Sequence, residues 1–314
     1  MAKVTIAIPT YNRPEFLTQS IQSVLGQTFQ DFKIVIFDDG SDFFYPDFLK
    51  QFNDPRIEVR TAEKDGRGNL SNFRRIYNCQ YDTDYLVIFH DDDCMHPRML
   101  EKEVAVLESN ANLVWVGTDL NFVKNYKKMN MFTKSPGSSA RVKTMDAQEA
   151  VREILRGFNL CFDSVMYRTK HLTDASELQT RFDKWFDRPY LISLIKTNRA
   201  AVIKQKLVNY RLHTGQDSAA KTANMDYTEY SKRLFRFYFS CLPRPLSAKD
   251  TKLFNAFVSN NALSLALAES HNWNEFKKSL AGLRKEGYFS LGAVNLKGYY
   301  YSAKLLLRKF YAGK

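Results

Sequence analysis

Two acidic clusters in the first hundred residues constrain the fold of this chain more than any other feature. Asp38 and Asp39 directly follow the apolar residues 34–37, and Asp91, Asp92 and Asp93 come just after the apolar residues 85–89. Short apolar runs that are bounded by turn residues are typical of buried parallel strands. Because open α/β sheets bind ligands at the carboxyl ends of their strands, we expect these acids to lie at one edge of a sheet.

The second cluster also predicts a metal ion. Three consecutive aspartates repel one another unless a cation neutralises them, and hard divalent cations prefer carboxylate oxygens. The alternative is that these acids only complement the amino-terminal end of the helix that follows them. We therefore expect a site that holds a divalent cation, Mn²⁺ or Mg²⁺, together with a phosphorylated ligand.

Strands and helices alternate along the first part of the chain. Pro14 suits the first turn of a helix, and strands are expected at residues 4–9, 34–37, 57–60, 85–89 and 113–117. This alternation is typical of a doubly wound α/β sheet. We expect residues 1–220 to form this domain, with a late strand at 201–208, and residues 221–314 to form a helical region.

Charge is unevenly distributed between these two regions. The 314 residues carry a net charge of +12, and residues 221–314 hold 16 Lys or Arg against 6 Asp or Glu. A basic region with interleaved Tyr and Phe suggests an anionic partner such as a bilayer surface, a nucleic acid or an anionic polymer. At residues 297–310 the pattern fits an amphipathic helix on an anionic membrane as well as it fits an ordinary packing helix.

The remaining composition points to a cytoplasmic protein. The four cysteines show no CxxC spacing, which is typical of reduced thiols. The chain shows no signal peptide, and no apolar run reaches the length of a membrane-spanning helix, which is roughly 18 residues. The expected location is the cytoplasm, with attachment to the inner face of the cell membrane as a further hypothesis.

Four blocks of sequence resemble family 2 glycosyltransferases of the GT-A fold. They are IPTYNRPEFLTQSIQSVLGQTFQDFKIVIFDDGS (8–41), GRGNLSNFRRIYN (66–78), FHDDDCMHP (89–97) and YRLHTGQDS (210–218). The resemblance implies a Rossmann-like, mainly parallel sheet flanked by helices. It also implies transfer of a sugar from a nucleotide-diphosphate sugar to an acceptor hydroxyl, with inversion at the anomeric carbon. Residues after about 220 carry no resemblance that informs function.

The first block supplies the expected nucleoside contacts. A uracil or thymine ring needs a stacking face and an acceptor for its imide N–H, which Tyr11 and Asp39 can provide. In the family that this block resembles, Thr10, Tyr11 and Asp39 contact the nucleoside. The alternative is that they only form turns. Asp38 is a weaker candidate, because adjacent strand residues point to opposite sides.

The middle and acidic blocks supply the expected diphosphate and ribose contacts. Arg67 and Asn72 lie where the family places base or phosphate contacts, although a solvated loop is the plain alternative. The family pattern usually reads Asp-x-Asp, and its first aspartate falls on His90. The resemblance therefore leaves the ribose contact to Asp91.

The metal ligands follow from the same resemblance. Counting back from Pro97, the usual metal-ligating aspartate falls on Asp92. The late histidine of the family, which reaches the metal or the diphosphate, corresponds to His213.

The catalytic base is expected in FDKWFDRPYLISLI. An inverting transfer needs a carboxylate that deprotonates the acceptor hydroxyl as it attacks. The family supplies this carboxylate just before a helix, which makes Asp187 the first candidate and Asp183 the alternative. Asp163 is the next candidate, and both of the first two could instead only cap the helix.

The predicted function is a metal-dependent glycosyltransferase that acts on a glycan or lipid-linked glycan acceptor, such as a growing capsule or O-antigen. One alternative is a nucleotidyltransferase that acts on sugar phosphates, but IPTYNRPEF is not the Gly-rich basic loop that such an enzyme needs. The other is a nucleic-acid-binding protein that uses the basic region. No recognition motif supports it, so no nucleic-acid partner is expected.

Overall fold

A computed structural model describes residues 2–43, 45–62, 69–124, 132, 140–156, 162–213, 215–216, 227–269, 273–285 and 290. The chain divides into two compact units. The first comprises residues 1–147 and 160–225, and the second comprises residues 148–159 and 226–314. The assignment of residues 1–220 to catalysis and of 221–314 to a separate basic region stays a prediction.

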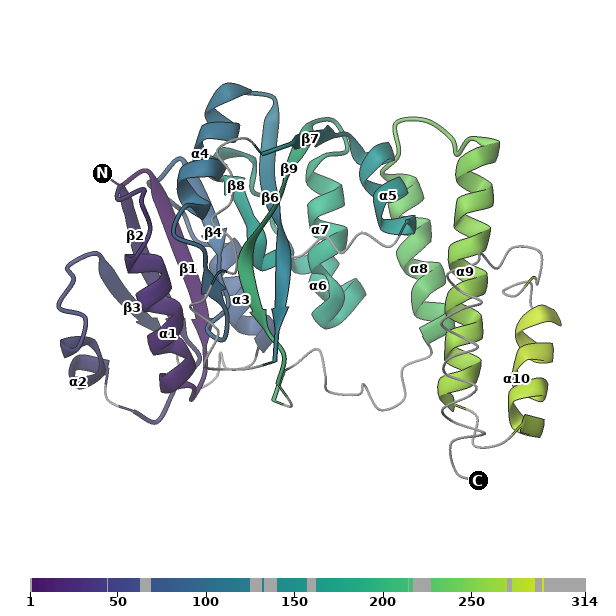
Figure 1. Cartoon of the computed structure of the whole chain (residues 1–314), viewed down its shortest axis with the longest axis horizontal. Helices are drawn as coiled ribbons and strands as arrows, with labels where there is room; N and C mark the ends of the chain where they lie inside the picture. The colour runs from purple at the N-terminus through teal and green to yellow at the C-terminus, as the bar shows by residue number, and fades with distance from the viewer. Residues whose placement is uncertain are drawn as a thin grey trace. The chain divides into compact units, whose positions relative to one another are not determined.

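A mixed sheet of nine strands forms the centre of the first unit in the described part of the chain (Figure 1). Its strands are β1 (Val4–Thr10), β2 (Phe32–Asp38), β3 (Ile57–Thr61), β4 (Tyr85–Ile88), β5 (Cys94–Met95), β6 (Leu113–Val123), β7 (Val142–Met145), β8 (Val165–Arg168) and β9 (Arg199–Arg211). Their order is β3-β2-β1-β4-β8-β6-β9-β5, and β7 pairs with β9.

Strand direction brings several strand ends to one edge of the sheet. Strands β3, β2, β1 and β4 are parallel, β8 runs antiparallel between β4 and β6, and β6 is parallel to β9. The carboxyl ends of β1, β2, β4 and β9 therefore lie at the same edge, together with the beginning of β8. The predicted α/β class is confirmed, with β5, β7 and β8 as its antiparallel members.

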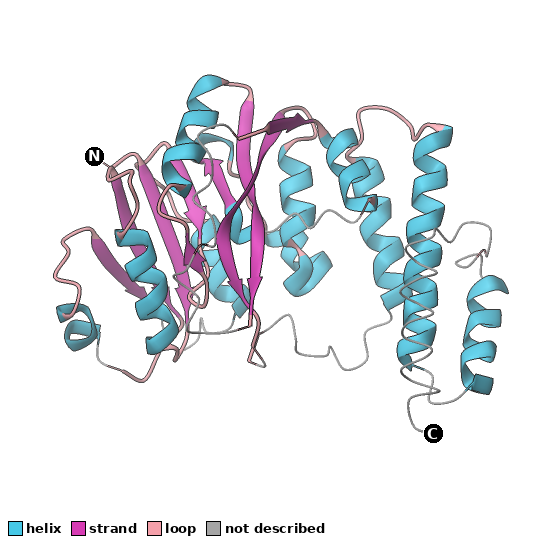
Figure 2. Ribbon diagram, viewed as in Figure 1, coloured by secondary structure: helices cyan, strands magenta, loops and turns pink. Residues whose placement is uncertain are grey.

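Helices cover both faces of this sheet (Figure 2). One face packs against α1 (Pro14–Leu25) and α4 (Met99–Ser109), whose apolar side chains join those of the strands in one buried core. The other face packs against α3 (Asn69–Tyr77) and α7 (Asp187–Leu194), and α6 (Ser176–Phe182) packs against α7. On that side Trp115 of β6 donates to the Leu191 carbonyl over 3.0 Å. The short helix α2 (Tyr45–Lys50) follows β2.

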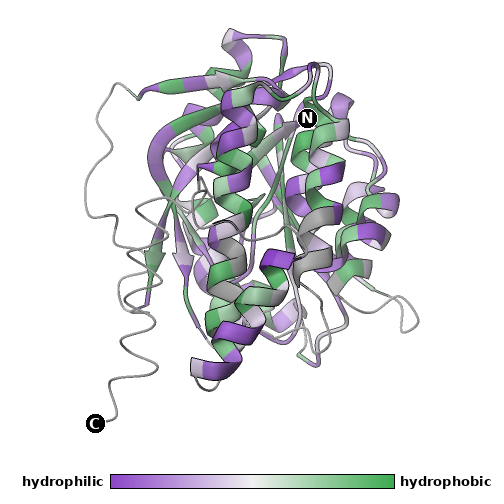
Figure 3. Ribbon diagram, turned by 90° about the vertical axis from the view of Figure 1, so that its right-hand side faces the viewer, coloured by the Kyte–Doolittle hydropathy of each residue, from purple (hydrophilic) through white to green (hydrophobic). Residues whose placement is uncertain are grey.

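The second unit is helical, as its sequence pattern predicts. It contains most of α5 (Ala147–Leu155), α8 (Tyr227–Ser240), α9 (Ala248–Glu269) and α10 (Trp273–Lys285). Aromatic contacts join α8 to α9, since the Phe235 ring lies 5.2 Å from those of Phe254 and Phe257. Figure 3 shows how apolar and polar residues are distributed along these helices. The proposed membrane-binding pattern at 297–310 lies outside the described residues, and no described helix is long and apolar enough to cross a bilayer.

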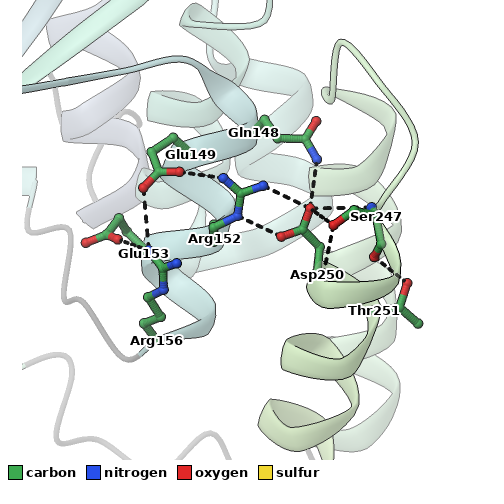
Figure 4. A network of polar contacts seen from close by, with 8 residues as sticks. All are labelled: Gln148, Glu149, Arg152, Glu153, Arg156, Ser247, Asp250 and Thr251. Carbon is green, nitrogen blue, oxygen red and sulfur yellow. Dashed lines mark hydrogen bonds and ion pairs between the residues drawn. The ribbon is translucent and has the colours of Figure 1, made fainter.

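A network of charged side chains holds α5 against the start of α9 (Figure 4). Asp250 accepts two hydrogen bonds from Arg152, over 2.7 and 3.0 Å. Asp250 also completes a capping box with Ser247, because the Ser247 hydroxyl accepts the Asp250 N–H while the Asp250 carboxylate accepts the Ser247 N–H. Glu149 binds Arg152 from the other side over 2.6 Å.

We expect Asp250→Asn to lower the free energy of unfolding by about 1–3 kcal/mol at pH 7, because a nearly buried charged partner of Arg152 is lost. Hydrogen bonds from Arg152 lower the pKa of Asp250, so its contribution is present above the unfolded-state pKa and is lost as the pH falls through the folded-state pKa. Urea unfolding at pH 7 and pH 3 measures both effects. Asp47→Asn, which removes an exposed pair with Lys50, is the matched control. Equal losses in the two variants would contradict the prediction.

Candidate active site

The predicted acidic clusters meet at the edge where β1, β2 and β4 end. Thr10 of β1 lies opposite Asp38 of β2 in the parallel register, and the Asp39 N–H donates to the Thr10 carbonyl over 3.0 Å. Residues 91–93 follow β4, the other neighbour of β1, and all three aspartates are buried. This is the edge at which ligands bind in open α/β sheets.

Thr10 and Asp91 join the first strand to the acidic loop. The Thr10 hydroxyl donates to Asp91 Oδ2 over 2.7 Å. Burial, and then the charge of Asp92, raise the pKa of Asp91 to about 6, while the Thr10 hydrogen bond and Arg13 act in the opposite direction. Asp91 is therefore a carboxylate that Thr10 anchors at the end of β1. The side chain of His90 lies elsewhere, with its ring in edge contact with Phe73 at 6.2 Å.

Asp92 and His213 are in direct contact. His213 Nε2 lies 2.8 Å from Asp92 Oδ2, although 121 positions separate the two residues in the sequence. His213 follows β9, whose carboxyl end lies at the same edge as the acidic loop. A carboxylate oxygen and an imidazole nitrogen at this separation are a fitting pair of ligands for Mn²⁺. The structure thus brings together the two residues for which metal binding was predicted.

Arg211 fixes the relative positions of these groups. Its side chain is fully buried; its Nε donates to the Asp92 carbonyl over 2.6 Å, and its Nη2 donates to Gln19 over 2.7 Å. Its backbone N–H donates to Asp93 Oδ1 over 2.7 Å, and its guanidinium lies 4.4 Å from the centre of the Phe16 ring. One side chain therefore joins α1, the acidic loop and the end of β9.

A second group of possible metal ligands lies beneath the acidic loop. Ligand atoms of His90, Asp93 and Asp163 lie within 4.8 Å of one another. Burial, and then the carboxylate of Asp163, raise the pKa of Asp93 well above its ordinary value. The carboxyl group of Asp93 contacts that of Asp163, and its Oδ1 accepts the Arg211 N–H. Two buried carboxyl groups in contact must share a proton or hold a cation.

The turn after β1 is fixed to the turn after β2. Asn12 has a positive φ of 51°, and its amide exchanges two 2.8 Å hydrogen bonds with Asp42. This arrangement leaves Tyr11 half exposed, at 50 %, beside the strand ends. Asp38 is engaged in its own turn, where it accepts bonds from Gly40, Ser41 and Tyr45. Asp39 is buried next to that turn.

Of the two expected diphosphate contacts, only Asn72 lies among the described residues. Asn72 is buried in α3, where its side chain donates to the Phe37 carbonyl over 2.7 Å and accepts from Arg75 over 3.3 Å. Its amide thus joins α3 to β2, and its contact with a donor stays a prediction. Arg67 lies outside the described residues.

The base candidates differ in their surroundings. Asp187 begins α7 behind Phe186, and the Phe186 ring packs on Phe73 at 6.0 Å. Burial raises the pKa of Asp187, while the charge of Arg188 opposes this. Asp183 is exposed and has a positive φ of 51° at the end of α6. Asp163 is fully buried beside Asp93.

Sequence reasoning missed Arg13 and Arg211 and did not foresee that Asp163 contacts Asp93. Arg13 and Arg211 lie inside the blocks IPTYNRPEF and YRLHTGQDS. Their closeness in sequence to predicted site residues could therefore have identified them as candidates. A deeply buried arginine needs acceptors on several sides, and a strand end beside three aspartates is a place that offers them.

Several known proteins are similar to this chain. The model of the family "Glycosyl transferase family 2" matches residues 5–170. An uncharacterized glycosyltransferase of Haemophilus influenzae is 22% identical over 311 residues, which cover 98% of this chain and 92% of that protein. The O-antigen biosynthesis glycosyltransferase WbnJ of Escherichia coli is 24% identical over 265 residues, with coverage of 77% and 94%.

The fold is similar to that of a solved structure. Residues 1–349 of S. aureus TarS in complex with UDP-GlcNAc match 98% of this chain and 89% of that one, with a TM-score of 0.63 and 15% identity. At this level of identity the match concerns the fold alone. It agrees with the GT-A-like arrangement that the sequence blocks imply.

Proposed function

The chain belongs to glycosyl transferase family 2, and from that premise we propose that it is a metal-dependent, inverting glycosyltransferase. Its donor would be a nucleotide-diphosphate sugar and its acceptor a glycan or lipid-linked glycan hydroxyl. The observation that carries the proposal is the contact between Asp92 and His213 at the edge where β1, β2 and β4 end. Family membership favours this function over a nucleotidyltransferase or a nucleic-acid-binding protein.

The nucleoside half of the donor is assigned to the ends of β1 and β2. Tyr11 offers an exposed ring for stacking, and Asp39 offers an acceptor for the imide N–H of a pyrimidine. Asp91, held by Thr10, would accept a hydrogen bond from a ribose hydroxyl. The UDP-GlcNAc complex of TarS makes uridine diphosphate sugars the first donors to test.

The diphosphate half is assigned to the acidic loop and the turn after β9. Asp92 and His213 would hold a divalent ion, which stabilises the negative charge of the departing nucleotide diphosphate. When His213 donates a hydrogen bond to Asp92, its Nε2 carries the ring proton. A metal ion would need the lone pair of Nε2, so His213 would bind the ion as the tautomer that is protonated on Nδ1. Arg67 is proposed as a further phosphate contact.

Asp187 is the proposed base. It begins α7 next to Phe186, whose ring packs on Phe73 of α3. There it would accept the proton of the acceptor hydroxyl while that oxygen attacks the anomeric carbon. Because burial raises its pKa, Asp187 is a stronger base than an exposed aspartate.

The acceptor is proposed to be a growing surface polysaccharide. The supporting finding is the similarity to WbnJ, an O-antigen biosynthesis enzyme. Attachment of the basic second unit to an anionic membrane would serve a lipid-linked acceptor, and the excess of Lys and Arg in residues 221–314 supports it.

One screen tests the proposed function. Uridine, guanosine and thymidine diphosphate sugars are each added with Mn²⁺, with Mg²⁺ or with EDTA, and the melting temperature is recorded. We expect stabilisation by at least one donor in the presence of metal and none with EDTA. Stabilisation by no donor, or equal stabilisation with EDTA, would contradict a metal-dependent donor site.

Asp39→Ala is expected to weaken binding of the nucleoside diphosphate about 10- to 100-fold, because a hydrogen bond to a charged acceptor contributes about 1.5–3 kcal/mol. Calorimetric titration measures this affinity. Asp31→Ala removes an exposed acid at the amino-terminal end of the same strand, where it accepts the Lys3 N–H, and should leave the affinity unchanged. An unchanged affinity in Asp39→Ala would show that the nucleoside assignment is wrong.

A further inference from the structure

Arg13 lies between the two carboxylates of the proposed donor site. Its Nη1 is 3.5 Å from Asp91 Oδ1 and 3.5 Å from Asp92 Oδ2, the oxygen that also contacts His213. The two carboxylates are nearly buried, whereas the Arg13 side chain is 30% exposed. A partly exposed cation from the protein itself thus lies next to the oxygens that a metal ion would need.

The other arm of Arg13 holds the turn that carries His213. Arg13 Nη2 donates to the Gly215 carbonyl over 2.6 Å. Gln216 closes the same turn by donating to the Arg211 carbonyl over 2.6 Å. Arg13 is therefore anchored to the turn after β9 by a short bond, and it reaches the carboxylates by long ones.

These distances make the carboxylate contacts easy to exchange. A charge-assisted N–H···O bond is usually about 2.7–2.9 Å long, so contacts of 3.5 Å are weak. A divalent ion sits about 2.0–2.2 Å from a carboxylate oxygen and would repel a guanidinium beside it. Arg13 and a metal ion therefore compete for the carboxylates of Asp91 and Asp92, and each weakens the binding of the other.

Charge balance indicates where Arg13 goes. In the donor-free protein Arg13 brings one positive charge to the carboxyl groups of both Asp91 and Asp92. When a divalent ion neutralises those carboxylates, the diphosphate brings two further negative charges. A guanidinium fork matches phosphate oxygens well, and the Arg13 side chain, which is 30% exposed, is accessible to a ligand at this edge.

We propose that Arg13 is a built-in counter-ion of the donor site, which neutralises Asp91 and Asp92 in the donor-free protein and moves to the donor diphosphate when the metal ion takes those carboxylates. The proposal rests on the proposed function, since it requires a metal ion at Asp92. It assigns Arg13 a positioning role on the donor rather than a part in proton transfer.

The test uses two probes whose affinities should change in opposite directions. Calorimetry at pH 7.5 measures Mn²⁺ alone, and then inorganic pyrophosphate in the presence of saturating Mn²⁺. In Arg13→Ala we expect Mn²⁺ to bind about tenfold more tightly, because its internal competitor is gone. We expect pyrophosphate to bind about tenfold more weakly, because a phosphate partner is gone. Arg13→Lys should lie between wild type and Arg13→Ala for both probes.

Arg98→Ala is the matched control. Arg98 immediately precedes helix α4 as Arg13 precedes α1, and it pairs with Glu101 outside the site. Both affinities should be unchanged in Arg98→Ala. In Arg13→Ala, a purely structural disturbance would weaken both probes, and a residue without a role would change neither. Either result overturns the proposal.

Failure of the proposed function would look different. If wild type binds neither Mn²⁺ nor pyrophosphate, the metal-dependent donor site itself is wrong, and the Arg13 proposal is wrong with it. If wild type binds both and the two affinities of Arg13→Ala move in the same direction, the donor site stands and only the role of Arg13 is refuted.

Discussion

Asp92→Ala is expected to abolish sugar transfer and to remove metal-dependent binding of the nucleotide sugar. Asp92 contributes the carboxylate that contacts both His213 and Arg13, so its loss removes the oxygen around which the proposed metal site is built. A metal ion supplies several kcal/mol of charge stabilisation to the leaving diphosphate. Loss of about 4 kcal/mol corresponds to a rate lower by about 10³-fold.

Turnover with added Mn²⁺ and the metal-dependent shift in melting temperature measure this effect together. Asp119→Ala, which removes an acid of β6 that pairs with Lys204 over 3.5 Å, is the control and should retain both properties. His213→Ala should lower activity less than Asp92→Ala, because a metal held by a carboxylate and the diphosphate can replace one ligand with water. Wild-type turnover by Asp92→Ala would refute the metal assignment.

Asp187→Asn should leave donor binding nearly unchanged and lower turnover about 10²- to 10⁴-fold, which is roughly 3–5 kcal/mol of barrier. The two effects differ because the carboxylate and the donor would act at different places. In the proposed mechanism the carboxylate would act on the acceptor proton in the transition state, whereas the donor would bind at the ends of β1, β2 and β4. Turnover at saturating donor, measured beside donor affinity by titration, separates the two effects.

Asp183→Asn is the matched control for the base. It removes an exposed carboxylate just before the same helix and should cost much less. If Asp183→Asn is the inactive variant, the two roles are exchanged. If neither variant changes turnover, the base lies elsewhere, and Asp163→Asn becomes the variant to test. Asp163 is less accessible than Asp187, because it is fully buried beside Asp93.

The order of strands and helices could be predicted because it depends on local patterns. The apolar runs that precede Asp38 and Asp91 are β2 and β4, and the helix expected at Pro14 begins there. Burial on both faces requires continuous apolar strands, and the ends of such strands require turn residues. The resemblance then supplied roles for Asp92 and His213, and the fold brings these two side chains into contact.

Other features required the tertiary structure. Residues 148–159 belong to the second unit, in which Arg152 of α5 pairs with Asp250 of α9, a partner 98 positions away. Strand β6 continues to Val123, beyond the strand expected at 113–117, because β9 pairs with it along its whole length. Pairing of distant strands does not follow from either strand's own sequence.

The sequence by itself determined the α/β class, the acidic strand ends and the family of this protein, because each rests on residues close together in the chain. Only the tertiary structure decided which charges face one another. Arg13 reaches Gly215 across 202 positions, and Arg211 reaches Asp92 across 119. Burying a charge is costly unless a partner neutralises it, and long side chains can find that partner on any neighbouring element. The partners of Arg13 and Arg211 therefore depend on how β9 and α1 pack around the acidic loop, and this packing cannot be predicted from any local sequence pattern.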